Sequence, residues 1–199
     1  SHSMILDPYS DSEIVVPQKN IAAVIGRALG GDITGKIGRI DGLTLGKYTI
    51  PQVIVNYPDP NSYMDTLRSS TVVRNGSIGG EVLSRFAVIF NYSKEKIYLK
   101  KNSMFRKAFQ TNLSGITLKA KGARLKTFEV IEVRKNSSAE EAGIQIGDLI
   151  VSVNGQRASE FDLNELNGEF SSKPGKKVAL ELSRNEKIIK KTLLLKAEI

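Results

Sequence analysis

The sequence has 199 residues, enough for two small domains, and a net charge of +8. Forty per cent of the residues are hydrophobic, and no run approaches the ~20 apolar residues of a membrane-spanning helix. There is no cysteine, and the single histidine, His2, lies in Ser1–Met4, which looks like an expression scar. Disulfides, thiol nucleophiles, histidine-dependent serine chemistry and ordinary zinc sites are therefore excluded, and we expect no metal and no cofactor.

Residues 5–103 have an all-β pattern, in which short β-branched segments alternate with turn residues. One helix is expected at 80–86, where Val82 and Phe86 lie on one face. The acidic residues are scattered on turns and loops and form no spaced pair suited to general acid–base catalysis. The expected strands are 14–16, 33–40, 43–45, 48–50, 53–55, 87–90 and 96–99.

A glycine-rich stretch, Gly30–Lys36, has the spacing of a phosphate-binding loop. That loop needs a serine or threonine after its lysine and then a helix, but here Ile37 and Gly38 follow. The alternation of apolar residues after Gly31 is typical of a β-hairpin with glycine at its tip. We therefore predict a hairpin and no nucleotide site.

Residues 104–199 change to a pattern of strand, helix, strand, helix and two strands. Ser137 is a natural N-cap for a short helix that Gly143 ends. A Gly147-Asp148 turn then leads into a strand over 149–153, which Asn154-Gly155 closes with a hairpin-type turn.

Basic residues gather between Lys101 and Lys126, where no acidic residue occurs. Such a field can bind nucleic acid or attract a carboxylate, but it can equally be a solvated linker. The only aromatic residues in this stretch, Phe105 and Phe109, are too few for a base-stacking platform. We predict no nucleic-acid partner.

The second region resembles a PDZ domain of the bacterial kind. The match lies in Ser137-Ser138-Ala139, Ala142-Gly143-Ile144, Gly147-Asp148-Leu149-Ile150 and Val153-Asn154-Gly155, in the family's order and spacing. The resemblance implies that the domain binds a polypeptide segment or a peptide C-terminus as an added strand.

Residue roles follow from the same resemblance. The backbone amides of Ser114, Gly115 and Ile116 would hold a terminal carboxylate, and Thr117 and Leu118 would run beside the peptide. Leu163, Leu166 and Phe170, on the helix that walls the groove, would either pack in the core or line the pocket for the ligand's last side chain. Ser114 departs from the large apolar residue usual before the loop glycine, which leaves carboxylate recognition and internal-segment recognition both open.

The first region resembles the closing part of retropepsin-like aspartic proteases. The resemblance lies in residues 75–92, where an apolar-glycine step, a short helix and a strand follow one another. It implies that Gly30, Gly31 and Asp32 belong to the flap, and that the protein is periplasmic or secreted, bacterial, and paired with a second protease lobe or protomer.

This chain has no Asp-Thr-Gly or Asp-Ser-Gly turn, which the aspartate dyad of that family requires. We therefore expect the catalytic turn upstream of this chain, and no peptidase activity from the chain itself.

The expected fold is mainly β, with two domains. Residues 5–103 would be the C-terminal part of a retropepsin-like aspartic protease domain. Residues 104–199 would be a PDZ-like α+β domain, a partly open β-barrel with two helices. Two functions remain open: the C-terminal part of an aspartic endopeptidase whose PDZ domain binds polypeptide substrates or partners, or a non-catalytic peptide-binding PDZ module on a β-rich interaction domain.

Overall fold

The computed structural model describes residues 3–28, 31–60 and 74–199, and the chain divides into two compact units. The first unit covers 1–109 together with Ile199, and the second covers 110–198. The boundary therefore lies after Phe109, later than the 103/104 position expected from the sequence. Phe105 and Phe109 explain the difference, because both side chains pack in the core of the first unit.

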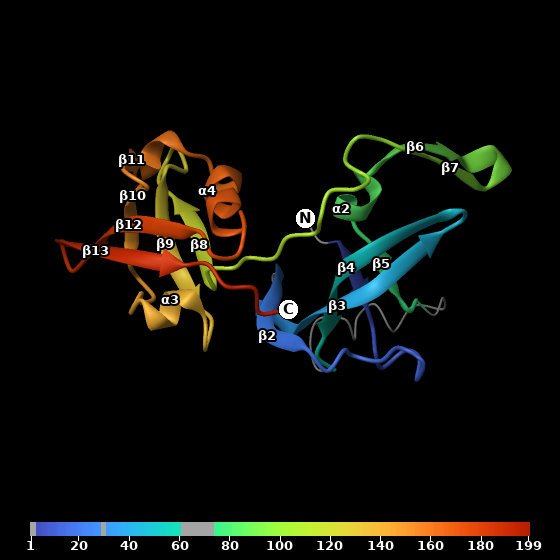
Figure 1. The fold of residues 1–199 in the computed structure, drawn as a ribbon, viewed down its shortest axis with the longest axis horizontal. Helices are drawn as coiled ribbons and strands as arrows, with labels where there is room; N and C mark the ends of the chain where they lie inside the picture. The colour runs from blue at the N-terminus through green and yellow to red at the C-terminus, as the bar shows by residue number, and fades with distance from the viewer. Residues whose placement is uncertain (1–2, 29–30, 61–73) are drawn as a thin grey trace. The chain divides into compact units, whose positions relative to one another are not determined.

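The first unit is built on a five-stranded sheet with the order β2-β3-β4-β1-β5 (Figure 1). Strands β2, β3 and β4 form an antiparallel meander, whereas β1 pairs with β4 in parallel. A separate two-stranded sheet contains only β6 and β7. The elements are β1 (Met4–Leu6), β2 (Asn20–Ala28), β3 (Gly31–Leu45), β4 (Tyr48–Pro58), β5 (Gly76–Ile78), α2 (Gly80–Leu83), β6 (Phe86–Asn91), the 3-10 turn η1 (Tyr92–Lys94) and β7 (Lys96–Lys101).

The strands of this unit are longer than the sequence pattern indicated. The two segments expected at 33–40 and 43–45 are one strand, β3, and those at 48–50 and 53–55 are β4. The breaks were expected at Asp41-Gly42 and at Pro51-Gln52, where residues typical of turns occur. In the structure Gly42 and Pro51 pair with each other inside the β3–β4 ladder, so both strands continue through them. Residues 14–16, which the structure describes, do not form the expected strand, and β2 was missed.

Two residues at the start of the described chain belong to the fold. Ser3 is buried, its hydroxyl donates to Glu81 at 2.5 Å, and its carbonyl oxygen accepts from the amide of Gly79 at 2.9 Å. Met4 begins β1. Ser3 and Met4 are therefore part of the described fold, while His2 lies outside the described residues. That residues 1–4 are an expression scar stays a prediction.

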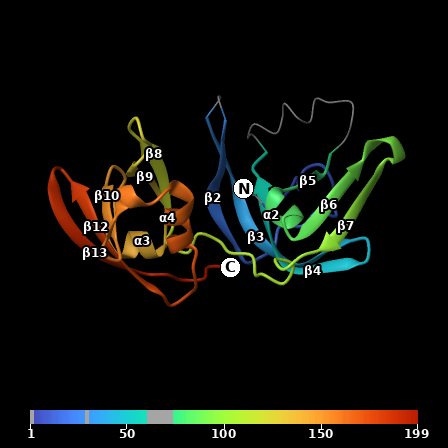
Figure 2. The ribbon, with the colours of Figure 1, turned by 90° about the horizontal axis from the view of Figure 1, so that it is seen from above.

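The second unit is a strongly bent sheet closed by two helices (Figures 1 and 2). The strand order is β13-β12-β10-β9-β8, and β11 pairs with β10. All of these pairings are antiparallel. The elements are β8 (Ile116–Lys121), β9 (Thr127–Val133), α3 (Ser138–Glu141), β10 (Leu149–Val153), β11 (Gln156–Arg157), the 3-10 turn η2 (Ala158–Glu160), α4 (Leu163–Phe170), β12 (Lys177–Arg184) and β13 (Lys187–Leu194).

The predicted local structure of this unit is confirmed. The Ser137 hydroxyl accepts from the amide of Glu140 at 3.3 Å, and α3 ends before Gly143, which has φ +71°. Strand β10 has the predicted bounds, and Asn154 and Gly155 both have positive φ, as a hairpin turn of this type requires.

A buried ion pair fixes the Gly147-Asp148 turn. Asp148 is 1% exposed, and its carboxylate accepts from Arg184 Nε at 2.7 Å and Nη2 at 2.8 Å and from the amide of Gln145 at 2.9 Å. Burial by itself raises the pKa of Asp148, but these hydrogen bonds and the charge of Arg184 outweigh it, so the pKa is lower than usual. The residues of this turn are therefore scaffold that positions strands on either side.

Candidate peptide-binding groove

The candidate groove lies along β8, the last strand of the second unit's sheet. Ile116 and Leu118 point into the core, whereas Thr117, Lys119 and Lys121 are exposed, as alternation along a strand requires. Strand β8 pairs on one side with β9, and α4 packs against it. In the described residues no strand covers the other side of β8.

Helix α4 packs against β8, where the expected groove would have its wall. It begins at an Asp162 capping box, in which Asp162 and Glu165 each accept from the other's backbone amide. Leu166 and Phe170 are fully buried in the core, so of the two roles considered for them they take core packing. Leu163 is only half-buried and is the apolar residue of the helix nearest to solvent.

The loop before β8 contains the three amides expected to hold a carboxylate, and each already has an acceptor. Asn112 Oδ1 accepts from the amides of Ser114 at 3.0 Å and Gly115 at 3.1 Å. The amide of Ile116 donates to the hydroxyl oxygen of Ser114 at 3.0 Å. Asn112 had no predicted role, although an asparagine that accepts from the backbone two residues later is a known turn signal.

The fold itself requires glycine at position 115. A Cβ at Gly115 would lie 2.2 Å from the Cβ of Ser137. Gly115 also has φ +80°. A substitution there would disturb the fold itself as well as the groove.

Arg134 also holds this loop in place through hydrogen bonds. Its Nη2 donates to the carbonyl oxygen of Asn112 at 3.1 Å, and its amide donates to the carbonyl oxygen of Gly115 at 2.9 Å. The guanidinium is paired in turn with the carboxylate of Glu198, through Nε at 3.1 Å and Nη2 at 2.5 Å. The loop is therefore held in one shape by side chains from three places in the chain.

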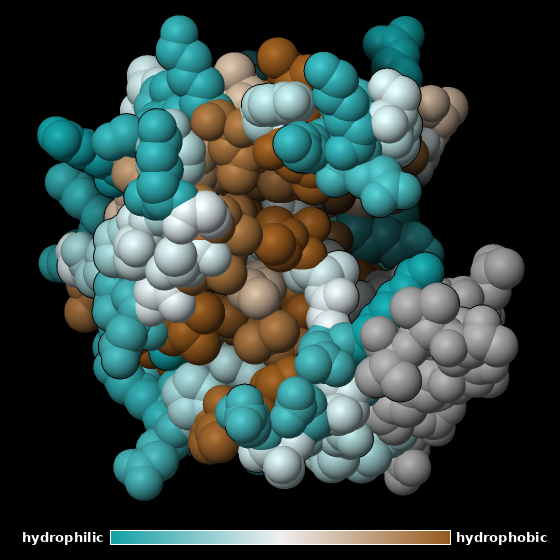
Figure 3. Space-filling model, turned by 90° about the vertical axis from the view of Figure 1, so that its right-hand side faces the viewer, coloured by the Kyte–Doolittle hydropathy of each residue, from teal (hydrophilic) through white to brown (hydrophobic). Residues whose placement is uncertain are grey.

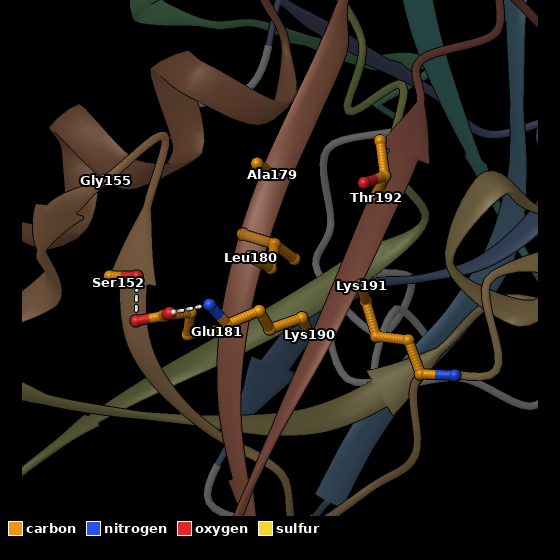
Figure 4. Close-up of a pocket in the computed structure, with 8 residues that line it drawn as sticks. All are labelled: Ser152, Gly155, Ala179, Leu180, Glu181, Lys190, Lys191 and Thr192. Atoms are coloured by element: carbon orange, nitrogen blue, oxygen red, sulfur yellow. Dashed lines mark hydrogen bonds and ion pairs between the residues drawn. The ribbon is translucent and has the colours of Figure 1, made fainter.

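A depression of about 390 Å³ lies on the sheet across β10, β12 and β13 (Figure 4). Its polar groups satisfy one another: the hydroxyl of Ser152 donates to Glu181 at 2.9 Å, and Lys190 lies 3.3 Å from the same carboxylate. Figure 4 shows Lys191 turned away from this cluster. Among the residues lining the depression, Ser152 has a carboxylate but no histidine beside it, so we assign no catalysis to this depression.

The first unit has its own exposed surface. Figure 3 shows apolar side chains gathered on the face of this unit. The outer half of the β6–β7 hairpin contributes cross-strand pairs of exposed residues, Ile89 with Tyr98 and Phe90 with Ile97. Large exposed apolar surfaces commonly mark interaction sites.

In the part of the chain that the structure describes, no group of three or more histidine, cysteine, aspartate or glutamate residues is placed to hold a metal ion. In the same part, no helix is both long and apolar enough to cross a membrane.

Residues 129–184 match the family model of the PDZ domain. The second unit contains a PDZ domain. The match runs from β9 to the end of β12, so the loop at Asn112 and the edge strand β8 precede the matched residues. The PDZ resemblance seen in the sequence is thereby confirmed.

Several solved structures are similar to this chain. One is the HtrA3 PDZ domain bound to a phage-derived ligand, with 26% identity and a TM-score of 0.37, over 43% of this chain and 86% of that one. Another is the HtrA-type protease AlgW with a decapeptide, with 16% identity and a TM-score of 0.43, over 93% and 62%. A third is a serine endoprotease from Yersinia pestis, with 16% identity and a TM-score of 0.41, over 94% and 65%.

This chain therefore spans less than two thirds of either protease, and likenesses of this size assign no activity to it.

The predicted aspartic peptidase is contradicted by these comparisons. The proteases found are described as HtrA-type and serine proteases, not aspartic ones, and no comparison supports a retropepsin-like first unit. The segment 75–92 misled the prediction because it consists largely of apolar residues that any β domain can use. In the structure, Val82 and Phe86 are simply core residues.

Because the aspartic peptidase is contradicted, the residues assigned to its flap no longer have a role in a protease. Gly31 and Asp32 begin β3 and pair with the end of β2, which confirms the predicted hairpin. Gly30 lies outside the described residues.

Proposed function

We propose that this chain is a non-catalytic peptide-binding module, in which the PDZ domain takes an extended polypeptide segment as an additional strand beside β8. The observation that carries this proposal is the terminal position of β8 in its sheet, with α4 packed against it. The open side of a terminal strand presents backbone N–H and C=O groups that an extended segment can pair with. Thr117 and Leu118 would lie beside that segment.

The polar side chains along β8 indicate only a weak charge preference for the bound segment. Thr117 donates to Glu132 at 2.9 Å and Lys121 is paired with Glu129, so both are already engaged with β9. Lys119 between them is exposed and adds positive charge. We therefore expect modest affinity with a weak preference for acidic side chains, which added salt would reduce.

Nuclear magnetic resonance of the isotope-labelled chain tests this proposal. Titration with extended decapeptides should shift the amide signals of Ile116–Lys121 and of α4. Strand β13 provides an internal control, because it is the terminal strand at the opposite end of the same sheet. Shifts confined to Lys187–Leu194 would place strand addition at the wrong edge and refute the proposal.

The first unit has a second candidate function, pairing with another copy of this chain through β6. Strand β6 contains no charged residue, whereas β7 contains three lysines, and in the described residues β6 pairs only with β7. Exposed edge strands usually carry charges that prevent such pairing. Two copies of β6 could join antiparallel about a two-fold axis and give a four-stranded sheet with the lysine-rich strands outside.

The hairpin supplies a matched pair of variants. Ile89 on β6 is 65% exposed and Ile97 on β7 is 60% exposed, so a lysine at either position meets similar surroundings. Light scattering coupled to gel filtration should give a dimer for the unmodified chain and for Ile97→Lys, but a monomer for Ile89→Lys. A monomeric unmodified chain at ~100 µM would exclude the pairing.

A periplasmic or secreted location was implied only by the resemblance to bacterial proteins, and it stays a prediction.

A further inference from the structure

A free C-terminal carboxylate can be recognised only if backbone N–H groups of the loop before β8 are available to it. None of the three is available here. Asn112 Oδ1 accepts from the amides of Ser114 and Gly115, and the Ser114 hydroxyl oxygen accepts from the amide of Ile116. The side-chain oxygen of Asn112 thus occupies the position that a ligand carboxylate would take.

Further contacts hold Asn112 in this position. Its Oδ1 also accepts from the Ser114 hydroxyl at 2.7 Å, and its Nδ2 donates to the carbonyl oxygen of Ile116 at 2.6 Å. Its backbone carbonyl accepts from Arg134, which is itself paired with Glu198. A carboxylate entering the loop would have to replace several hydrogen bonds that are already formed, and it would gain little over them.

The space next to the loop is closed as well. The side chain of a ligand's last residue would need an opening between β8 and α4 close to Ile116. Ile116, Leu166 and Phe170 are all fully buried, and the carbonyl oxygen of Phe170 accepts from the amide of Leu113 at 2.9 Å. The helix is therefore tied to the loop, and core side chains fill that space.

The rest of β8 is different, because Thr117 to Lys121 present an open edge with exposed side chains at alternate positions. Resting on the peptide-binding function proposed above, we infer that the groove binds internal extended segments and does not read a free C-terminus. Asn112 is the specificity-determining residue, since its side-chain oxygen already accepts the hydrogen bonds of the Ser114 and Gly115 amides.

Two variants of Asn112 separate this role from a merely structural one. Asn112→Ala removes the internal acceptor and frees the amides of Ser114 and Gly115. Asn112→Asp is the comparison variant, because it keeps an oxygen that can accept from the amides of Ser114 and Gly115 and loses only the Nδ2 donor to the carbonyl oxygen of Ile116. Thermal unfolding of both variants establishes that the domain is folded before any binding is measured.

The first measurement needs no ligand. Hydrogen exchange of the Ser114 and Gly115 amides should be slow in the unmodified chain and at least about tenfold faster in Asn112→Ala, because their hydrogen-bond acceptor is lost. Equal exchange rates in the two proteins would overturn the closed loop.

The second measurement compares ligands. Random heptapeptides are selected against the full chain in two formats, with free C-termini and with a fixed C-terminal extension, and synthetic versions are titrated as free acids and as amides. For the unmodified chain and Asn112→Asp, we expect binders from the extended format and affinities within about twofold for acid and amide. For Asn112→Ala, we expect the acid to gain about tenfold or more over the amide, as charge-assisted hydrogen bonds allow.

The outcomes distinguish this inference from the proposed function. A preference of the unmodified chain for free acids by more than about fivefold would refute the inference and leave peptide binding intact. The absence of any gain for acids in a folded Asn112→Ala would remove the role of Asn112. Failure to recover binders in either format from any of the three proteins would refute both proposals.

Discussion

Replacement of Asp148 by asparagine tests whether the buried ion pair organises the second unit. The carboxylate is 1% exposed and accepts from two nitrogens of Arg184 and from the amide of Gln145. The amide group of asparagine keeps one oxygen but turns N–H groups toward one of those donors. Loss of a buried charged partner typically costs 3–5 kcal/mol, and since Arg184 keeps some contact with solvent we expect about 2–4 kcal/mol.

The measurement is urea unfolding of the full chain, monitored by the nuclear magnetic resonance amide signals of the second unit. A domain with about 5–10 kcal/mol of stability would show this change clearly. The exposed pair of Glu181 and Lys190 provides the control: Glu181→Gln should leave the free energy of unfolding unchanged within the error of the measurement. A cost below about 1 kcal/mol for Asp148→Asn would refute the reasoning.

The same residue predicts a pH dependence. Because the folded-state pKa of Asp148 is lowered, its contribution to stability is fully present above the unfolded value of about 4 and is lost as the pH falls through the folded pKa. Below about pH 4 the free energy of unfolding should therefore fall less steeply in Asp148→Asn than in the unmodified chain. Identical slopes in that range would contradict the assignment.

Three further substitutions make separate predictions, each measured by urea unfolding of the full chain. Ile150→Ala should cost about 2–5 kcal/mol because Ile150 is buried, and Leu149→Ala should cost less because Leu149 is only half-buried; the reverse order would mean that β10 faces the other way. Gly115→Ala should cost at least about 2 kcal/mol because of the contact with Ser137 and the positive φ, and a neutral effect would contradict the close packing of the loop against Ser137. Arg85→Met should cost less than about 2 kcal/mol, because two opposing effects are of similar size. Arg85 is 2% exposed, burial lowers its pKa, and its Nε and Nη2 have no hydrogen-bond partner among the described residues, all of which favour an apolar side chain. Its Cζ lies 3.6 Å from the centroid of the Phe109 ring, a favourable contact that methionine replaces only in part, and a larger loss would show that this contact dominates.

The sequence predicted the second unit better than the first because its signals are local. A capping serine, a helix-ending glycine and an Asn-Gly turn each act over three or four residues, and all three are found where the sequence placed them. In the first unit, Gly42 and Pro51, two residues typical of turns, pair with each other inside the β3–β4 ladder. That pairing is not visible in either segment alone, so β3 and β4 were each divided in two.

The candidate groove illustrates the same limit. The PDZ resemblance indicated the correct loop, but it assigned the amides of Ser114, Gly115 and Ile116 to a ligand. Whether those amides are free depends on the rotamer of Asn112 and on Arg134, which lies 22 residues further along the chain. The family resemblance indicated where the site lies. Whether its backbone amides are free could be seen only from the three-dimensional contacts.

The ion pair between Arg134 and Glu198 has a practical consequence for anyone who excises the second unit. A fragment that stops at Ala197 would keep every helix and strand of this unit and the buried Leu195, yet it would lack the carboxylate that anchors Arg134. Arg134 in turn secures Asn112 and Gly115, so such a fragment would have a looser loop and altered ligand preferences while its circular dichroism spectrum looked normal. Binding data from fragments that end before and after Glu198 therefore describe two different recognition surfaces.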